Sequence, residues 1–470
     1  MKRYTTIALV LATLVGSACK DNAVVNPVDA PTVDALSGGL TRAGLNPLVT
    51  GVLGQDRAAF ATTTVLILSE IFARDVYRID TSEPRYVNET LGGQPDPGSF
   101  AGSGGWTNFY VATRAANNLI LAIPDAPSSE FSDAEKRAAL GFLRTIKALD
   151  YYRVLEMRDT IGIAIQTDDP TEIPVIKCKT AVLTYIAALL DSANADFTAA
   201  GATTEVPFLL PAGYRTFGRD YSVVSNLVRF NRGLKGKVDL YRVLDHQNPQ
   251  PALAATAVAE LTEALGGAAP GAVPAADFTK GAYYKFVPGG SENFANPRAD
   301  DKIALHPLLR DSLQAGDTRA SKVVNRTATL AGQGLSSNIT FSGAVPTPAN
   351  QEAPIAILRD EELVLLRAQA NVEAGNLLAA AQDVNSVRAN YGLAPVVFAD
   401  RTSAINEILY EKRFSLLFEG PQRLVDLRAY SRLSGTYFRA EFPADPYNKA
   451  FPIPKPEADA RGGTAPACTA

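Results

Sequence analysis

Carboxylates and arginines are the side chains in this sequence that could carry out chemistry. The chain holds only two histidines and three cysteines, which excludes zinc-finger, histidine-triad and cysteine-cluster sites. With 45 Lys and Arg against 49 Asp and Glu, and no basic block, it lacks the charge pattern of a nucleic-acid-binding surface. We therefore expect no metal, no cofactor and no nucleic-acid partner. The remaining catalytic option is a pair of carboxylates acting as acid and base.

Acids and arginines gather near the C-terminal end. A predicted helix over about 403–418 turns Arg413 towards the core. A guanidinium there requires a carboxylate partner, because an unpaired buried charge is very costly. The nearby candidates are Glu411, Glu419 and Asp426. Acid–base catalysis is one interpretation, but a structural ion-pair network is favoured, because the arginines are as numerous as the acids: Arg413, Arg423 and Arg428.

Aromatic side chains beside loops are a second kind of candidate site, since apolar sugar faces pack on rings. Trp106, the single tryptophan, follows the glycine-rich run Gly102–Gly105, and it is either a sugar platform or the first core residue of a helix, which is the favoured alternative. The stretch Asp75–Tyr86 mixes aromatic and charged groups in a predicted loop, which suits a polar ligand and equally a solvated loop. The candidate ligand-binding residues are Tyr77, Arg78, Tyr86, Trp106, Asn108, Tyr283, Tyr284 and Phe294.

Helical periodicity dominates the segments that must position these groups. Over about 39–245, apolar residues recur at three- and four-residue steps, and Ser132 with Glu135 forms a capping box. Residues 246–355 hold many of the prolines and glycines and predict loops and short strands. Helical periodicity returns over 356–470. The predicted fold is mostly α: an irregular scaffold of tetratricopeptide-like helix pairs with a loop-rich inserted lobe.

The N-terminal residues have the composition of an export signal. The apolar run Ile7–Val15 follows basic residues and is too short to span a bilayer. We expect residues 1–18 to be a signal peptide, Cys19 to become the acylated first residue, and 19–38 to be a tether. Gly16 stands where a lipobox usually has Leu, and ordinary secretion is the alternative.

Two cysteines remain once Cys19 is assigned to the lipid. Cys178 and Cys468 could form a disulfide in an oxidising compartment. Two free thiols are an equal alternative from the sequence.

A set of short motifs runs along the chain. The C-terminal part contains NEILYEKR at 406–413 and FEGPQRLVDLR at 418–428. Further motifs are Trp106-x-x-x-Tyr110 with Asn117, GFLR at 141–144, GDTR at 316–319, the segment 359–375 and FPIP at 451–454. In this order, they resemble the SusD/RagB family of nutrient-binding lipoproteins. Pro421, Gln422 and Leu424 depart from the family pattern.

The resemblance implies a non-enzymatic protein, lipid-anchored at the bacterial outer membrane and exposed at the cell surface. Such a protein captures an oligosaccharide or a peptide and passes it to a SusC-like TonB-dependent β-barrel transporter. The residues of the C-terminal signature are interpreted as structural: Glu411, Arg413, Glu419, Gly420, Arg423 and Asp426. An exported carboxylate-dependent glycoside hydrolase and a helical-repeat scaffold that binds only proteins are the alternatives.

Overall fold

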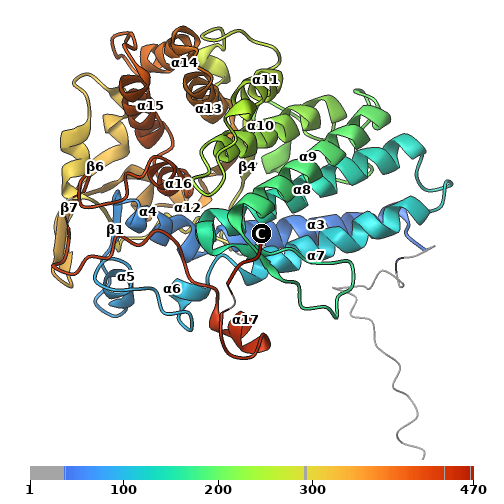
Figure 1. Ribbon diagram of the computed structural model, residues 1–470, viewed down its shortest axis with the longest axis horizontal. Coiled ribbons are helices and arrows are strands. Elements are labelled where there is room, and N and C mark those ends of the chain that lie inside the picture. The colour runs from blue at the N-terminus through green and yellow to red at the C-terminus, as the bar shows by residue number, and fades with distance from the viewer. Residues whose placement is uncertain (1–35, 37–38, 290–293, 439, 466) are drawn as a thin grey trace, which may run out of the picture.

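The computed structural model describes residues 36, 39–289, 294–438, 440–465 and 467–470. The predicted signal peptide, Cys19 and all of the predicted tether except residue 36 lie outside the described residues. Helices dominate the described chain and the strands are short, so the predicted fold class is confirmed (Figure 1).

Four helix pairs form the framework of the described chain. They are α3 (Arg42–Phe60) with α7 (Thr107–Ala122), α8 (Asp133–Arg158) with α9 (Lys179–Ala200), α10 (Val224–Val243) with α11 (Ala254–Ala264), and α13 (Asp360–Glu373) with α14 (Leu377–Asn390). Each pair packs on the next, because α7 contacts α8, α9 contacts α10 and α11 contacts α13. A further helix, α15 (Arg401–Ser415), packs on α13 and α14. Figure 1 shows α3, α7, α8 and α9 side by side, with α13, α14 and α15 at the opposite end of the array.

Local sequence explains where the long helix α8 begins and how closely it packs. Ser132 accepts a hydrogen bond from the amide of Glu135, whose side chain accepts one from the amide of Ser132, so the predicted capping box is present. Further along, a Cβ placed on Gly141 would lie 2.5 Å from the ring of Phe197 on α9. Glycine therefore permits the close crossing of α8 and α9.

Short antiparallel strand pairs fill the spaces between the helices. They are β1 (Val76–Arg78) with β5 (Ile303–Leu305), β2 (Ile163–Ala164) with β3 (Ile176–Lys177), β4 (Gly281–Tyr284) with β8 (Ile355–Arg359), and β6 (Val323–Gly332) with β7 (Leu335–Phe341). The shorter α-helices are α4 (Ser69–Phe72), α5 (Arg85–Asn88), α6 (Phe100–Ser103), α12 (Pro348–Glu352), α16 (Gln422–Ala429) and α17 (Lys455–Ala460). A π-helical turn at Thr64–Leu68 and several short 3-10 helices accompany them.

Two segments are more regular than the sequence suggests. Residues 254–264 form helix α11 instead of loop, and they bury Ala257 and Leu261 on the side where α11 packs against α10. The helix has only eleven residues and lies between Pro251 and the glycines Gly266 and Gly267, so the composition of the segment is typical of loops. The predicted last helix ends at Ser415, and α16 and α17 follow it.

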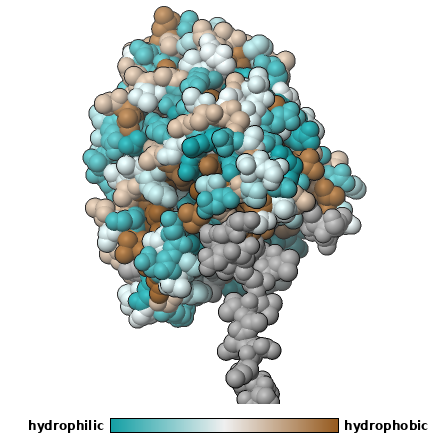
Figure 2. Space-filling model, turned by 90° about the vertical axis from the view of Figure 1, so that its right-hand side faces the viewer, coloured by the Kyte–Doolittle hydropathy of each residue, from teal (hydrophilic) through white to brown (hydrophobic). Residues whose placement is uncertain are grey.

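One large apolar core runs through the helix array, and a smaller one lies among α13, α14 and α15. On the face to the right of Figure 1, hydrophobic residues form small areas between hydrophilic ones (Figure 2). Within the described part of the chain, no helix combines the length and the hydropathy needed to cross a membrane.

Candidate functional site

A cavity of about 1100 Å³ opens between α3, α7 and the segment that joins β2 to β3. This volume is slightly larger than the range of about 300–1,000 Å³ that is usual for ligand sites. Glu457 of α17 contributes to the wall from the C-terminal part of the chain. Four segments that are distant in sequence therefore meet around one space.

The helix α3 presents an unusually flat wall to this cavity. Gly44 and Gly51 are both lining residues, and they lie on the same face with Leu48 and Val52. No heavy atom lies within 4 Å of a Cβ placed on Gly51. The space beside the α3 backbone is therefore open at Gly51.

Trp106 lies directly before α7 and forms part of the opposite wall. It is mostly buried, with 5% of its surface exposed, and its ring contacts that of Tyr110 at 4.9 Å. The guanidinium of Arg158 lies 5.3 Å from the Trp106 ring and donates to the carbonyls of Gly102 and Gly104. Burial lowers the pKa of Arg158 to about 9. Trp106 is thus a core residue that also lines the cavity.

The glycines before Trp106 allow close packing. A Cβ on Gly102 would overlap the carbonyl of Asp96, a Cβ on Gly104 would overlap the side chain of Thr64, and Gly105 has a φ of +65°. The run that the sequence suggests as a loop includes the end of α6 and is tightly packed. Its glycines fix the position of Trp106 and give no sign of a phosphate-binding loop.

Hydrogen bonds from α7 hold the first half of the β2–β3 segment. The Tyr110 hydroxyl donates to the carbonyl of Ala164 at 2.8 Å, and Thr113 donates to the side chain of Gln166 at 2.7 Å. Arg114 donates to the carbonyl of Thr167 at 2.9 Å. Residues 164–168 are therefore fixed against α7 and form a firm part of the wall.

Polar groups lie around the opening of the cavity. Gln55 and Thr107 are lining residues and are exposed, whereas Arg114 and Asn118 are half-buried in the wall. Val111 lies among them with 45% of its surface exposed. The site thus combines an apolar wall with hydrogen-bonding groups at its edge, as binding sites for small polar molecules commonly do.

Two carboxylates also line the cavity, Glu172 and Glu457. Glu457 pairs with Arg461 at 2.5 Å, and Glu172 is exposed to solvent. A general acid in a glycosidase needs a protonated carboxyl, which is typically obtained by burial in an apolar pocket. Neither carboxylate has that environment, so the lining favours binding over acid–base catalysis.

The predicted candidates in Asp75–Tyr86 lie in a strand and a helix turn and serve internal contacts. Tyr77 is buried in β1, and its hydroxyl donates to Glu441 at 2.6 Å. Arg78 pairs with Asp300 at 2.8 Å and lies 3.9 Å above the ring of Tyr86. The expectation of a loop is wrong for 76–78, which pair with β5, and for 85–86, which begin α5, whereas residues 79–84 between them are irregular. A role of these residues in ligand contact stays a prediction.

The aromatic candidates of the middle segment are separate from the cavity. Tyr283 stacks on Phe217 at 4.2 Å and Tyr284 is buried with its hydroxyl on Asp56. Phe294 faces Phe286 at 6.4 Å. Of the eight predicted ligand-binding residues, only Trp106 lines the cavity, and Asn108 is exposed in the first turn of α7.

The charged residues of the C-terminal signature form buried and half-buried ion pairs. Glu411 pairs with Arg319 at 2.7 Å and with Arg388 at 3.0 Å. Glu419 pairs with Arg359 at 2.9 Å, and Asp426 pairs with Lys412 at 2.6 Å. The partner of Arg413 is none of the nearby acids but Asp75, which also pairs with Arg423. At Gly420, a φ of +146° favours glycine.

Sequence reasoning missed most of the cavity lining. One available signal was a second stripe on α7, where Thr107, Tyr110, Arg114 and Asn118 recur at three- and four-residue steps beside the core stripe. Gly44 and Gly51, seven residues apart on one helix, were another. Glu457 gave no such signal, because only the fold brings α17 to the first helix pair.

Comparisons with known proteins agree with this architecture. Residues 316–456 match the model of the SusD family. NanU of Bacteroides fragilis shares the fold with a TM-score of 0.64 at 14% identity, covering 90% of this chain and 96% of its own. A laminarin-binding SusD-like protein has a TM-score of 0.63 at 17% identity, covering 88% of this chain and 97% of its own. Surface glycan-binding protein A from Bacteroides thetaiotaomicron has a TM-score of 0.63 at 12% identity, with the same two coverages.

No curated protein matches the sequence. The fold defines the class as a SusD-like helical scaffold with irregular helix pairs. The match of residues 316–456 to the SusD family model and the shared fold both agree with the resemblance of the motifs to the SusD/RagB family.

Proposed function

We propose that the protein is a non-enzymatic, lipid-anchored glycan-binding protein of the bacterial outer membrane, exposed at the cell surface, and that its cavity between α3 and α7 binds an oligosaccharide. The single observation that carries this proposal is the composition of the cavity wall. It combines the aromatic residues Trp106 and Tyr110 with polar side chains around a volume of about 1100 Å³. Two structures with the same fold are described as a laminarin-binding protein and a surface glycan-binding protein.

Sugar chemistry matches this wall. A pyranose has apolar C–H faces, which pack on rings and aliphatic groups, and hydroxyls at its edge, which need donors and acceptors. Trp106, Tyr110 and Val111 supply the first kind of contact, and Gln55, Thr107 and Asn118 lie where the second is required. A peptide is the alternative ligand.

The delivery step forms a second part of the proposal. The bound glycan would pass to a SusC-like TonB-dependent β-barrel, with Cys19 carrying the lipid that keeps the protein at the membrane. This part rests on the match of residues 316–456 to the SusD family model and on the resemblance of the motifs. Gentle solubilisation of the native membrane should yield the protein together with a stoichiometric large β-barrel, and a Cys19→Ala variant should leave the membrane fraction. Retention of that variant through lipid would contradict the anchor.

Ligand class and catalysis can be tested in one experiment. The protein is titrated by calorimetry with a panel of neutral and acidic oligosaccharides, including laminarin oligosaccharides, and with a panel of short peptides. The same mixtures are then analysed for cleavage products by chromatography. We expect one class of glycan to bind with one-to-one stoichiometry and to remain intact. Binding of peptides alone, or release of shorter sugars, would contradict the proposal and favour the alternatives.

A further inference from the structure

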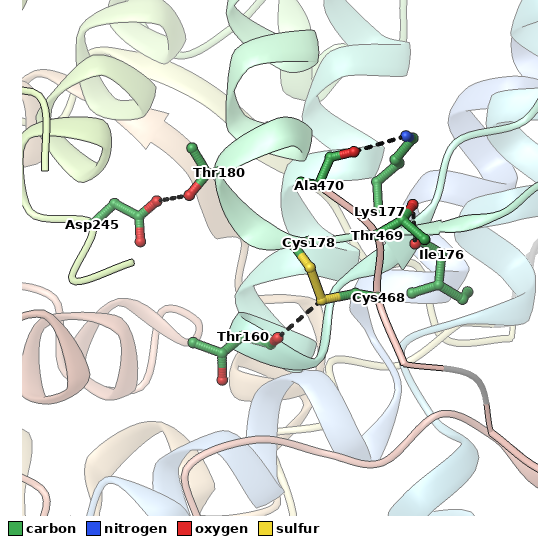
Figure 3. Close-up of a disulfide and its surroundings, with 9 residues drawn as sticks. All are labelled: Thr160, Ile176, Lys177, Cys178, Thr180, Asp245, Cys468, Thr469 and Ala470. Carbon is green, nitrogen blue, oxygen red and sulfur yellow. Dashed lines mark hydrogen bonds between the residues drawn. A yellow bond between two sulfur atoms is a disulfide. The ribbon is translucent and has the colours of Figure 1, made fainter. Parts of the chain in front are cut away.

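Residues 467–470 run beside the β2–β3 pair as a short third strand, which pairs with β3 through the single parallel β-bridge between Lys177 and Thr469. The amide of Cys178 donates to the carbonyl of Thr469 at 2.8 Å, and the amide of Thr469 donates to the carbonyl of Ile176 at 2.8 Å. The Lys177 ammonium also reaches the carbonyl of Ala470 at 3.0 Å (Figure 3). The strand β3 is therefore held by β2 on one side and by the C-terminal residues on the other.

A disulfide joins this strand covalently to the beginning of α9. Cys178, the residue before α9, is bonded to Cys468, and their Cα atoms lie 4.9 Å apart across 290 positions of sequence (Figure 3). Gly162 beside β2 makes room for the junction: a Cβ there would overlap the carbonyl of Lys177 and lie 2.9 Å from Cβ of Cys468. The third strand is thus packed in place as well as cross-linked.

The β2–β3 pair is the base of one cavity wall. Its connecting segment supplies Gln166, Pro170, Glu172 and Pro174 to the lining. Residues 164–168 are fixed by α7, through the hydrogen bonds of Tyr110, Thr113 and Arg114. In the second half, Thr171 and Glu172 donate their amides back to Asp169 within the same segment. The position of this second half therefore depends on where β3 is held.

The same C-terminal part of the chain supplies a second wall group. The amide of Lys455, at the start of α17, donates to the carbonyl of Pro97 at 2.9 Å, and Glu457 of that helix lines the cavity. Exposed residues 462–465 then lead towards Cys468. The chain between Glu457 and the disulfide is short, so anchoring Cys468 restricts how far α17 can move.

We propose that Cys178 and Cys468 are positioning residues for the cavity, because their disulfide holds the strand 467–470 on β3. The disulfide thereby keeps the second half of the β2–β3 segment and Glu457 in their positions in the cavity wall, where they would contact the ligand. A terminal strand with two backbone hydrogen bonds gains little against the entropy of its ordering, so the covalent link keeps it paired. The consequence for ligand affinity rests on the proposed function, whereas the effect on the wall does not.

The test uses the full chain and a Cys178→Ser/Cys468→Ser double variant. Amide hydrogen exchange of residues 171–178 and 469 should become about ten-fold faster or more in the variant, because their strand partner is released. Residues 164–168 form an internal control, since α7 holds them, and their exchange should not change. Binding of the glycan found in the titrations above should weaken by about three- to ten-fold as the wall loses its order.

A second route avoids any folding defect of the variant. Folded wild-type protein is treated with dithiothreitol, which supplies two electrons and two protons to the S–S bond, giving two thiols, and is itself oxidised to a cyclic disulfide. The reduced protein should show the same exchange pattern, and reoxidation should reverse it. Ile408→Ala, in the separate core of α15, is the matched control for general loss of stability. It should leave exchange at 171–178 and glycan affinity unchanged.

Unchanged exchange at 171–178 after loss of the disulfide would overturn the proposal, whatever the ligand. Faster exchange with unchanged glycan affinity would overturn the positioning role. If no glycan binds the wild-type protein, the proposed function fails, and the exchange measurement alone still decides whether the disulfide holds the wall.

Discussion

Asp75 and Arg413, which are 338 positions apart in the sequence, form an ion pair with 2.5 Å between Oδ1 and Nη2. Arg423 adds a second guanidinium at 2.7 Å. Burial alone would raise the pKa of Asp75, but the guanidiniums of Arg413 and Arg423 lower it below its usual value. One carboxylate before β1 thus connects the N-terminal part of the chain to the C-terminal signature.

Replacing this carboxylate should strongly destabilise the protein. Asp75→Asn leaves the two arginines close together without their shared counter-charge, and we expect a loss of about 3–5 kcal/mol in the free energy of unfolding at pH 7. Urea denaturation measures it. Glu83→Gln, which removes the partner of Arg85 in an exposed pair, should have little effect. A stability of Asp75→Asn equal to that of the wild type would contradict the account.

The stabilisation from Asp75 should also depend on pH. Because its folded pKa lies below the unfolded value, the folded state binds the proton less readily. The contribution is therefore complete above the unfolded pKa, near 4, and is lost as the pH falls through the folded value.

Asp56 of α3 and Asp150 of α8 have pKa values that are raised, in contrast to the lowered pKa of Asp75. Both are fully buried, and their carboxyl groups lie close enough for the charge of one to raise the pKa of the other. Burial raises the pKa of Asp56 to about 6, although the hydroxyl of Tyr284 and the charges of Arg153 and Arg57 oppose this shift. Burial and the charge of Asp56 raise the pKa of Asp150 well above its usual value. The pair therefore holds a proton in the folded state.

This pair predicts a loss of stability as the pH rises. The folded state binds more protons than the unfolded one, so the contribution of the pair falls from about pH 4 through about pH 6 and beyond. In the Asp150→Asn variant, a neutral amide replaces one of the two carboxyl groups, so folding no longer requires that this group be protonated. The difference in unfolding free energy, variant minus wild type, should therefore rise between pH 4 and pH 8. Asp125→Asn, at an exposed position, is the control and should show no such trend.

Two helix glycines should respond in opposite ways to alanine. A Cβ on Gly141 would meet the ring of Phe197 at 2.5 Å, so Gly141→Ala overpacks the α8–α9 contact and should cost about 1–3 kcal/mol. Gly51 of α3 has open space, so Gly51→Ala should gain up to about 1 kcal/mol from helix propensity alone. Urea midpoints of the two variants give the comparison. Equal effects would show that the two positions do not differ in packing.

The helix pairs could be predicted from the sequence because each buries one apolar stripe, and the capping box at Ser132 marks a boundary by local chemistry alone. The partner of Arg413 could not be found in this way, since Asp75 comes near only when the whole array has folded. The aromatic and charged residues around Arg78 are typical of both a ligand-binding loop and a solvated loop. In the structure, Arg78 instead forms an internal ion pair with Asp300. The cavity was not predicted, because helices are recognised in the sequence by the apolar residues that they bury. The cavity is lined instead by glycines of α3 and by the polar stripe of α7, which do not belong to the buried face.

The cavity offers a sharp test because two glycines of α3 differ only in what they face. A Cβ placed on either Gly51 or Gly54 would have no heavy atom within 4 Å, but only Gly51 lines the cavity. Gly51→Leu should therefore fill part of the binding space without disturbing the fold. Gly54→Leu makes the same chemical change about one turn further along and outside the cavity.

Calorimetric titration of these two variants with the glycan that binds the wild type tests the central claim most directly. The account predicts that Gly51→Leu loses about ten-fold or more in affinity by steric exclusion of the ligand, while it keeps the wild-type melting temperature or exceeds it. Gly54→Leu should bind as the wild type does. Wild-type affinity in Gly51→Leu would contradict the assignment of the α3–α7 cavity as the glycan site.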